Sequence, residues 1–304
     1  MAPGSEQAMD IGIWYPSEGA VPASPNTPFG QALAIGAEPA GSALPVVILS
    51  HGNGGWMGSH ADTALALADA GYVAIGLTHS DDNSKNENVA PSVWMFSRPR
   101  ELIASIDEVQ QHWPDARHMS EDQIGVFGFS AGGYTALVAA GAVPDIDLAV
   151  QHCKVQPLEY LCVIGVVDEL ADNLQSGALT EFAGDSRIKA VSVAAPAFGF
   201  TFNAKSLQAV TVPVQIWSGA LDERVPHDSN GGVISSALPG LNEVEIVAGA
   251  GHFSYLTPCD PAMQAANAGL WERICVDATG FDRLAFHDTF NARVVEFFDK
   301  AMVP

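Results

Sequence analysis

The sequence is poor in basic residues. It has 13 Lys and Arg against 35 Asp and Glu over 304 residues, which gives a formal net charge of −22. Nucleic-acid phosphates and anionic lipid headgroups are bound chiefly through Lys and Arg, and no local basic cluster compensates for the imbalance. We therefore expect neither nucleic-acid binding nor stable membrane association.

Long apolar runs are missing as well. No stretch of about 18 apolar residues occurs, so the sequence predicts no membrane-spanning helix. Residues 1–7 have neither the charged region nor the apolar region of a signal peptide. An exported form would have lost its signal peptide before this sequence begins.

Cofactor motifs are also missing. The sequence has no H-E-x-x-H zinc motif, no G-x-x-x-x-G-K loop and no G-x-G-x-x-G turn after a predicted strand, so we expect no cofactor and no metal. The four cysteines form two near pairs, Cys153 with Cys162 and Cys259 with Cys275, without C-x-x-C spacing. Spacing alone leaves two local disulfides and four free thiols equally open.

Apolar runs bounded by turn residues alternate with helix-like segments along most of the chain. The expected buried strands are 45–50, 72–78, 123–127, 188–195, 212–219 and 243–247, and the expected helices are 61–71, 98–113, 230–238 and 283–302. This alternation predicts an α/β fold with a mostly parallel sheet and helices on both faces. Residues 9–15 are expected to form an edge strand, paired antiparallel with a second strand at 29–35.

The length of the chain fits one domain, 1–304. The regular alternation lapses at about 142–185. This stretch is interpreted as a cap insertion of one or two helices over the catalytic face, or else as a longer helix packed on the sheet.

One turn indicates a reaction type. Residues 128–132 read Gly-Phe-Ser-Ala-Gly, between the apolar run 123–127 and the helix-like segment 134–140. In such a G-x-S-x-G turn the serine occupies a strained corner between strand and helix, and its hydroxyl projects into a cleft. Ser130 is therefore the candidate nucleophile.

A serine hydroxyl needs a base to take its proton and an acid to orient that base. His252 lies in a glycine-rich turn after the last predicted strand, and Asp222 follows the strand that ends at Gly219. The order Ser130, Asp222, His252 is the one that α/β-hydrolase topology requires. The alternatives are His51 as base, and Asp168, Glu169 or Glu223 as acid.

Two backbone N–H groups are expected to stabilise the negative charge that develops on an attacked carbonyl. Ala131, which follows the nucleophile, is the expected first donor, and Asn53, in the glycine-rich turn 51–55, is the second, unless its side chain only supports that turn. The candidate walls of the substrate pocket are Trp56, Phe129, Trp94, Phe198 and Phe253, although each aromatic fits the core equally well.

With these residues in place, the sequence resembles the α/β-hydrolase superfamily, and more narrowly an exported dienelactone-hydrolase-like group akin to the platelet-activating-factor acetylhydrolases. The resemblance covers nearly the whole chain. It rests on residues 14–16, 50–55, 98–99, 124–133, 219–222 and 251–253, and most specifically on a late run at 280–283, 286–287 and 290–291 with Cys259 upstream.

The resemblance implies catalytic roles for Ser130, Asp222 and His252 and oxyanion donors at Asn53 and Ala131. It also implies disulfides Cys153–Cys162 and Cys259–Cys275, and hence a periplasmic or secreted protein. Dienelactone hydrolases proper use a cysteine nucleophile, whereas this chain has serine, which favours an ordinary carboxylic ester over a dienelactone.

We therefore expect a monomeric serine carboxylesterase that forms an acyl-enzyme with soluble small-molecule esters of short to medium chain. A phospholipase or acetylhydrolase, a hydrolase of polyester fragments, and an amidase or peptidase are alternatives with the same triad. From another class, a non-catalytic binding protein on this scaffold would make the coincidence of the three residues accidental.

Overall fold

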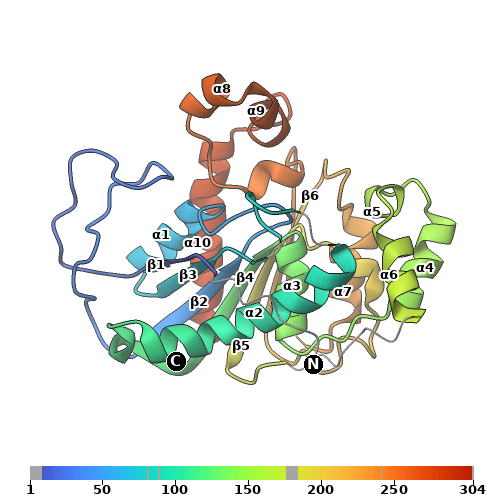
Figure 1. Cartoon of the computed structure of the whole chain (residues 1–304), viewed down its shortest axis with the longest axis horizontal. Coiled ribbons are helices and arrows are strands. Elements are labelled where there is room, and N and C mark those ends of the chain that lie inside the picture. The colour runs from blue at the N-terminus through green and yellow to red at the C-terminus, as the bar shows by residue number, and fades with distance from the viewer. Residues whose placement is uncertain (1–8, 81, 88–89, 176–183, 241, 303–304) are drawn as a thin grey trace.

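The computed structural model describes residues 9–80, 82–87, 90–175, 184–240 and 242–302. Residues 1–7 and part of the segment 142–185 therefore lie outside the described residues. Within these ranges, seven strands form one sheet in the order β1-β3-β2-β4-β5-β6-β7 (Figure 1). They are β1 (Ile11–Trp14), β2 (Leu44–Ser50), β3 (Val73–Leu77), β4 (Met119–Phe129), β5 (Ile188–Ala194), β6 (Val214–Gly219) and β7 (Asn242–Val247).

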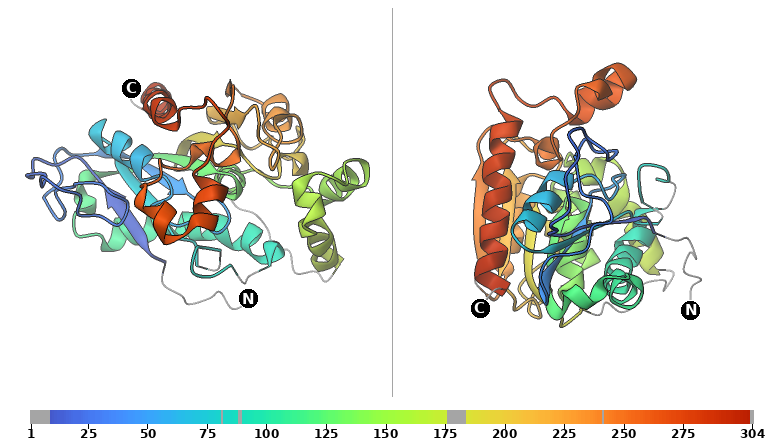
Figure 2. Two further views of the ribbon diagram at one scale, coloured as in Figure 1. Left: turned by 90° about the horizontal axis from the view of Figure 1, so that it is seen from above. Right: turned by 90° about the vertical axis from the view of Figure 1, so that its left-hand side faces the viewer.

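The sheet is parallel except at one edge, where β1 runs antiparallel to β3. Both faces are covered. Helices α1 (Ala61–Asp69) and α10 (Arg283–Met302) pack on one face, and α2 (Pro91–His112), α3 (Ala131–Ala139) and α7 (Gly231–Ala237) pack on the other (Figure 2). The predicted α/β fold with a mostly parallel sheet is confirmed.

Strand β2 shows why the central strands read as continuous apolar runs. Val46 and Ile48 belong to the core on the α2 side, whereas Val47 and Leu49 belong to the core on the α10 side. All four side chains are buried. Because successive side chains of a strand point to opposite faces, a sheet covered on both faces needs an apolar residue at every position.

Three helices follow α3, in the stretch where the alternation of strand and helix lapses. They are α4 (Ile146–Val155), α5 (Tyr160–Val163) and α6 (Val166–Gln175), and they lie at one end of the molecule (Figure 1). The Cys153–Cys162 disulfide joins α4 to α5. Because a covalent bond closes this short loop, α5 keeps its place although it has a single buried residue, Leu161.

The sequence predicted no helix between the last strand and α10, but the structure has two, α8 (Ala262–Ala266) and α9 (Ala268–Ile274). They project from the body of the molecule (Figures 1 and 2). Neither helix contains a buried residue, so neither has the apolar periodicity by which helices are recognised. The Cys259–Cys275 disulfide closes this segment at its base.

The predicted strand at 29–35 is wrong, because local polar contacts bend the chain there. The hydroxyl of Thr27 accepts a hydrogen bond from the Gln31 N–H at 2.8 Å, and Gly30 has a φ of +77°. The Gln31 side chain accepts from the indole of Trp14 and donates to the carbonyl of Ala61. Such local side-chain bonds compete with strand pairing, and β1 pairs with β3 instead.

The helix predicted at 98–113 begins seven residues earlier, at Pro91. Proline suits the first turn of a helix because the N–H that it lacks would have no partner there. Pro99 lies inside the helix. The early start places Trp94 in the first turns of α2, where its side chain is buried.

The predicted turn between β4 and α3 has the expected strain. Ser130 has a φ of +54°, in the left-handed region that non-glycine residues rarely adopt. A Cβ atom on Gly132 would collide with the carbonyl oxygen of Ser50, and one on Gly128 would collide with the carbonyl oxygen of Gly132. The serine corner therefore requires glycine at both positions.

We predict that Gly132→Ala destabilises the protein by about 3 kcal/mol or more, because the added methyl group meets backbone that cannot move aside without displacing β2. Gly269→Ala is the matched control. Its methyl group would lie in open space on α9, with Asn267 Oδ1 the nearest atom at 3.8 Å, and a small gain in stability is expected. Denaturant unfolding of the two variants checks this, and equal stabilities would contradict it.

Candidate active site

Ser130, His252 and Asp222 lie in one chain of hydrogen bonds. Nε2 of His252 is 3.0 Å from Oγ of Ser130, and Nδ1 is 2.7 Å from Oδ2 of Asp222. The tautomer that satisfies both contacts carries its proton on Nδ1 and turns the lone pair of Nε2 toward the serine hydroxyl. The three residues follow β4, β6 and β7, so they meet where the carboxyl ends of parallel strands lie together.

The carboxylate of Asp222 is buried and uses both of its oxygens. Oδ2 accepts from His252, and Oδ1 accepts from the backbone N–H groups of Arg224, at 2.9 Å, and Val225, at 2.8 Å. These bonds fix the orientation of the carboxylate, which in turn orients the imidazole. Of the alternative acids, Asp168 and Glu169 lie on α6, and Ser92 donates a hydrogen bond to Glu169.

The predicted pocket aromatics divide into two groups. Phe129 and Phe253 flank the ring of His252, with centroid distances of 5.0 and 5.1 Å. Trp94 and Phe198 are buried and pack edge to face against one another, and Trp56 packs against Phe29. The structure therefore places two of the five next to the candidate base and the other three in packing contacts of their own.

A cation also lies beside this group. The guanidinium of Arg224 is 5.0 Å from the ring centroid of Phe253 and 4.5 Å from that of Tyr160, whose hydroxyl accepts a hydrogen bond from it at 2.7 Å. Arg224 therefore joins α5 to the loop that carries His252. Sequence reasoning missed this link, because Tyr160 and Arg224 are 64 residues apart and no local pattern relates them.

The predicted oxyanion donors lie on two segments that approach Ser130 from different sides. Ala131 is the first residue of α3, where backbone N–H groups have no partner within the helix. A Cβ atom on Gly52 would come within 3.3 Å of the Cβ of Ser130, so the turn 51–55 lies directly against the serine. The side chain of Asn53 donates to Oδ1 of Asp82 at 2.7 Å and so supports the turn.

The turn 51–55 is held by a buried ion pair. Asp82 accepts from the Asn53 side chain and the Gly54 N–H through Oδ1, and from Arg98 through Oδ2, at 2.9 Å. Arg98 also donates to the backbone carbonyl of His51. Burial lowers the pKa of Arg98, while the charges of Asp82 and Glu101 act in the opposite direction. The guanidinium thus ties α2 to both ends of the turn.

A second chain of Ser, His and carboxylate lies behind this turn. Ser50 Oγ is 2.9 Å from Nε2 of His79, and Nδ1 of His79 is 2.7 Å from Oε2 of Glu101. Ser50 and His79 have no exposed surface, and burial together with Arg98 holds the pKa of His79 well below its usual range. A substrate cannot reach this serine, so we assign the group to support of the turn.

One residue of this support, Arg98, could have been recognised from the sequence. Arg98 precedes the apolar positions Leu102, Ile106 and Val109 on one face of α2. A charged residue on the apolar face of a helix is rarely buried without a partner. Asp82 is far less readable, because it lies in a polar loop that looks exposed.

A hollow of about 1000 Å³ lies away from Ser130, beside the Cys259–Cys275 disulfide. Phe29, Trp271 and Phe281 contribute aromatic side chains to its lining, and none of the five predicted pocket aromatics lines it. Among the described residues, no group of three or more His, Cys, Asp and Glu is placed to hold a metal ion. No helix in the described ranges is long and apolar enough to cross a membrane.

Comparisons with known proteins agree with this architecture. Residues 32–158 match the model of the dienelactone hydrolase family. A ferulic acid esterase from Streptomyces cinnamoneus superposes with a TM-score of 0.62 at 18% sequence identity, and the match covers 97% of this chain and 82% of that chain. No curated protein sequence matches the chain. At this identity the structural likeness speaks for the fold.

We predict that Asp82→Asn destabilises the protein by about 3 to 5 kcal/mol, because it leaves the Arg98 guanidinium buried without a countercharge. Lys85→Ala is the control, since it removes an exposed partner of Asp10 at 3.5 Å, and such surface pairs contribute about 0 to 1 kcal/mol. Chemical denaturation measures both changes. A cost for Asp82→Asn no larger than for the control would overturn the assignment of the pair as an anchor.

His60, packed edge to face against Phe127 and Phe129, makes stability depend on pH. Burial lowers its pKa to about 4. As the pH falls below about 6.5, the imidazole of His60 takes up a proton in the unfolded chain but not in the folded protein. The free energy of unfolding therefore falls by about 3 kcal/mol between pH 6.5 and about pH 4. Replacement by Phe should remove that part of the loss.

Unfolding free energies of the wild type, His60→Phe and His112→Gln at pH 7, 5.5 and 4 check this prediction. The side chain of His112 is 65% exposed, so its variant should follow the wild type. Identical pH dependence in all three proteins would show that His60 is not the responsible group.

Proposed function

We propose that this chain is a dienelactone-hydrolase-like α/β-hydrolase, and more narrowly a serine carboxylic ester hydrolase acting on soluble esters of short to medium chain. The observation that carries the proposal is the continuous contact from Ser130 Oγ through His252 to Asp222, with distances of 3.0 and 2.7 Å. The strained backbone of Ser130 supports it further, since strain of this kind gathers at functional sites.

The reaction begins when Oγ of Ser130 attacks the ester carbonyl and Nε2 of His252 takes the hydroxyl proton. The carbonyl π electrons move to oxygen, and the N–H groups of Ala131 and Asn53 stabilise the oxyanion. The imidazolium then gives its proton to the leaving alcohol as the C–O bond breaks, which leaves an acyl group on the serine. Water, deprotonated by His252, then attacks the acyl carbon. The bond from that carbon to Oγ breaks, His252 returns the proton to Oγ, and the carboxylic acid leaves.

The role of Asp222 is to hold the Nδ1 proton and to stabilise the imidazolium that forms in each half of the reaction. Its second oxygen is satisfied by two backbone N–H groups, so the carboxylate has no nearby position to rotate into. This is the arrangement expected of an orienting acid rather than of a group that itself takes up a proton.

The substrate class is inferred from three features. A serine nucleophile favours an ordinary carboxylic ester, and the net charge of −22 disfavours an anionic lipid surface. The solved structure that superposes on this chain is named a ferulic acid esterase, which makes a hydroxycinnamate ester a sensible member of a substrate panel. Phe129 and Phe253, whose rings both contact that of His252, are proposed to contact the bound acyl or alcohol group.

An extracytoplasmic location is part of the proposal. The structure contains both disulfides expected from the resemblance, Cys153–Cys162 and Cys259–Cys275, and no free cysteine among the described residues. Disulfides persist mainly in oxidising compartments such as the periplasm and the exterior.

The test is hydrolysis of p-nitrophenyl esters of increasing acyl length, beside methyl ferulate, a lactone and a matched amide. The wild type should hydrolyse the shorter esters, and Ser130→Ala should lower kcat by about 10⁴- to 10⁶-fold. Ser236→Ala, which removes an exposed hydroxyl on α7, should behave as the wild type.

Labelling with a fluorophosphonate probe separates the proposal from a non-catalytic scaffold. The wild type should carry the probe on Ser130, and His252→Ala should carry it far more slowly. A wild-type protein that neither binds the probe nor hydrolyses any member of the panel would refute the proposal, and faster cleavage of the amide than of its ester would make the chain an amidase.

A further inference from the structure

The turn that carries His252 is short and irregular. It is a single turn of 3-10 helix, His252–Tyr255, that begins after Gly251. A Cβ atom on Gly251 would have no neighbour within 4 Å, so packing does not hold this corner of the chain. Asp222 orients the His252 ring, but the backbone that carries the ring needs contacts from elsewhere in the turn.

Ser254 provides two of these contacts through its hydroxyl. Its Oγ accepts a hydrogen bond from the Gly251 N–H at 2.9 Å and donates one to Oδ1 of Asp277 at 2.6 Å. Ser254 is buried, so water does not replace either partner. The hydroxyl thus ties Gly251, the residue just before His252, to the carboxylate of Asp277, which lies 23 residues after Ser254.

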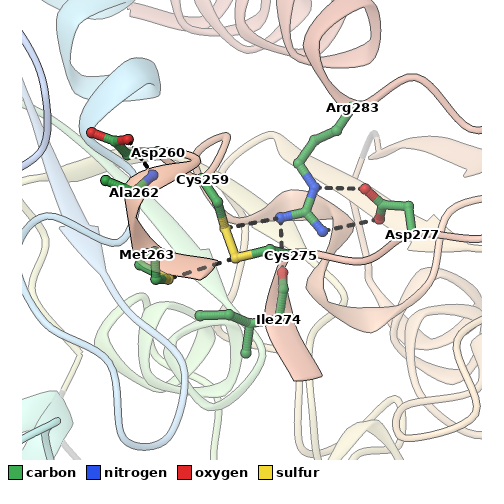
Figure 3. Close-up of a disulfide and its surroundings, with 8 residues drawn as sticks. All are labelled: Cys259, Asp260, Ala262, Met263, Ile274, Cys275, Asp277 and Arg283. Atoms are coloured by element: carbon green, nitrogen blue, oxygen red, sulfur yellow. Dashed lines mark hydrogen bonds and ion pairs between the residues drawn. A yellow bond between two sulfur atoms is a disulfide. The ribbon is translucent and has the colours of Figure 1, made fainter. Parts of the chain in front are cut away.

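Asp277 is itself held rigidly. Arg283 donates to Oδ2 through Nε, at 2.8 Å, and to Oδ1 through a terminal nitrogen, at 3.0 Å. This paired geometry fixes the plane of the carboxylate. The other terminal nitrogen of Arg283 donates to the carbonyl of Ile274 at 2.8 Å, and it lies 4.0 Å from the sulfur of Cys259, as Figure 3 shows.

The disulfide matters to this arrangement because α8 and α9 offer no packing. Neither helix has a buried residue, yet they separate the His252 turn from Asp277 in the sequence. The Cys259–Cys275 bond brings the two ends of this segment together, so that Asp277, two residues after Cys275, lies beside Ser254. Figure 3 shows the guanidinium of Arg283 between the disulfide and Asp277.

A second set of contacts holds the same residue through its backbone. Nε2 of His287 donates to the carbonyl of Ser254 at 2.9 Å, and Nδ1 of His287 is 2.6 Å from Oδ2 of Asp62. Burial alone would raise the pKa of the Asp62 carboxyl, but hydrogen bonds from His287, Asn291 and Thr257 outweigh burial and hold that pKa well below its ordinary range. A charged carboxylate thus supports His287.

One face of α10 supplies this frame. Arg283, His287 and Asn291 are spaced four residues apart, so they project from the same side of the helix. Arg283 reaches Ser254 through Asp277, whereas His287 contacts its carbonyl directly, and Asn291 donates to Asp62 at 2.7 Å. The long closing helix therefore acts on the His252 turn through polar side chains.

We propose that Asp277 and Ser254 are positioning residues for His252, and that the Cys259–Cys275 disulfide with Arg283 holds Asp277 where it can act. The inference rests on the proposed function, because it assigns His252 as the base. Without the Ser254–Asp277 bond, the hydroxyl that accepts from the Gly251 N–H is no longer held in place, and the imidazole can move away from Ser130. A shift of about 1 Å in a reacting group lowers the rate about 100-fold.

The experiment compares Asp277→Asn and Ser254→Ala with Asp260→Asn in p-nitrophenyl ester hydrolysis and in the rate of fluorophosphonate labelling. Both positioning variants should lower kcat and the labelling rate about 10- to 100-fold, with little change in KM. Asp260→Asn is the matched control, since this exposed aspartate undergoes the same change near the same disulfide but caps α8 instead.

A second arm shows whether the effect passes through the histidine. In a His252→Ala background, Asp277→Asn should leave the residual labelling rate unchanged, because the group that it positions is already gone. A structural defect would lower that rate again. If Asp277→Asn does not fold because Arg283 is left unpaired, Ser254→Ala decides the question, since it removes no charge.

The outcomes separate this inference from the proposed function. A wild type without activity or labelling overturns the proposed function and the inference with it. An active wild type, with both positioning variants equal to Asp260→Asn, overturns the inference alone. The same holds if Asp277→Asn lowers the rate equally with and without His252.

Discussion

The structure depends on one close approach between backbones, at the corner where β4 becomes α3. Gly132 lies against the carbonyl of Ser50, so the start of α3 and the end of β2 share a space that admits no side chain. This contact holds Ser130 in its left-handed conformation and brings the turn 51–55 beside it. Arg98 and Asp82 then secure that turn from α2. These contacts therefore connect the candidate nucleophile and the turn 51–55 directly to the sheet.

The regular part of this fold could be read from the sequence because burial imposes periodicity. Strands covered on both faces favour apolar runs, which are clearest in β2, β3 and the second half of β4. The order of Ser130, Asp222 and His252 could be read as well, since topology fixes where each strand delivers its loop. The prediction of a strand at 29–35 was wrong because Thr27 and Gln31 form local and long-range polar contacts that cannot be inferred from the alternation of residues.

The features that could not be predicted from the sequence are those in which no buried apolar residues recur at a regular spacing. Helices α8 and α9 bury nothing, and so leave no apolar stripe. Ser254 and Asp277 meet through one hydrogen bond between irregular segments. The run 280–291 contributed to the family resemblance, but the sequence did not indicate what its residues contact. In the structure, Arg283 contacts Asp277, and His287 contacts the carbonyl of Ser254 in the His252 turn. Ser50 and Ser130 each contact a histidine that in turn contacts a carboxylate. The left-handed φ of Ser130 and its exposed fraction of 8%, against 0% for Ser50, distinguish the two serines.

The projecting segment 260–274 has a further consequence. A covalent bond closes it at its base, no side chain of its helices enters the core, and Asp277 lies just beyond its end. Such a segment can be shortened or extended at little cost in stability, provided that the two cysteines still meet. It borders the hollow beside the disulfide. The molecule thus carries a surface segment whose side chains can change without altering the packed core beneath it.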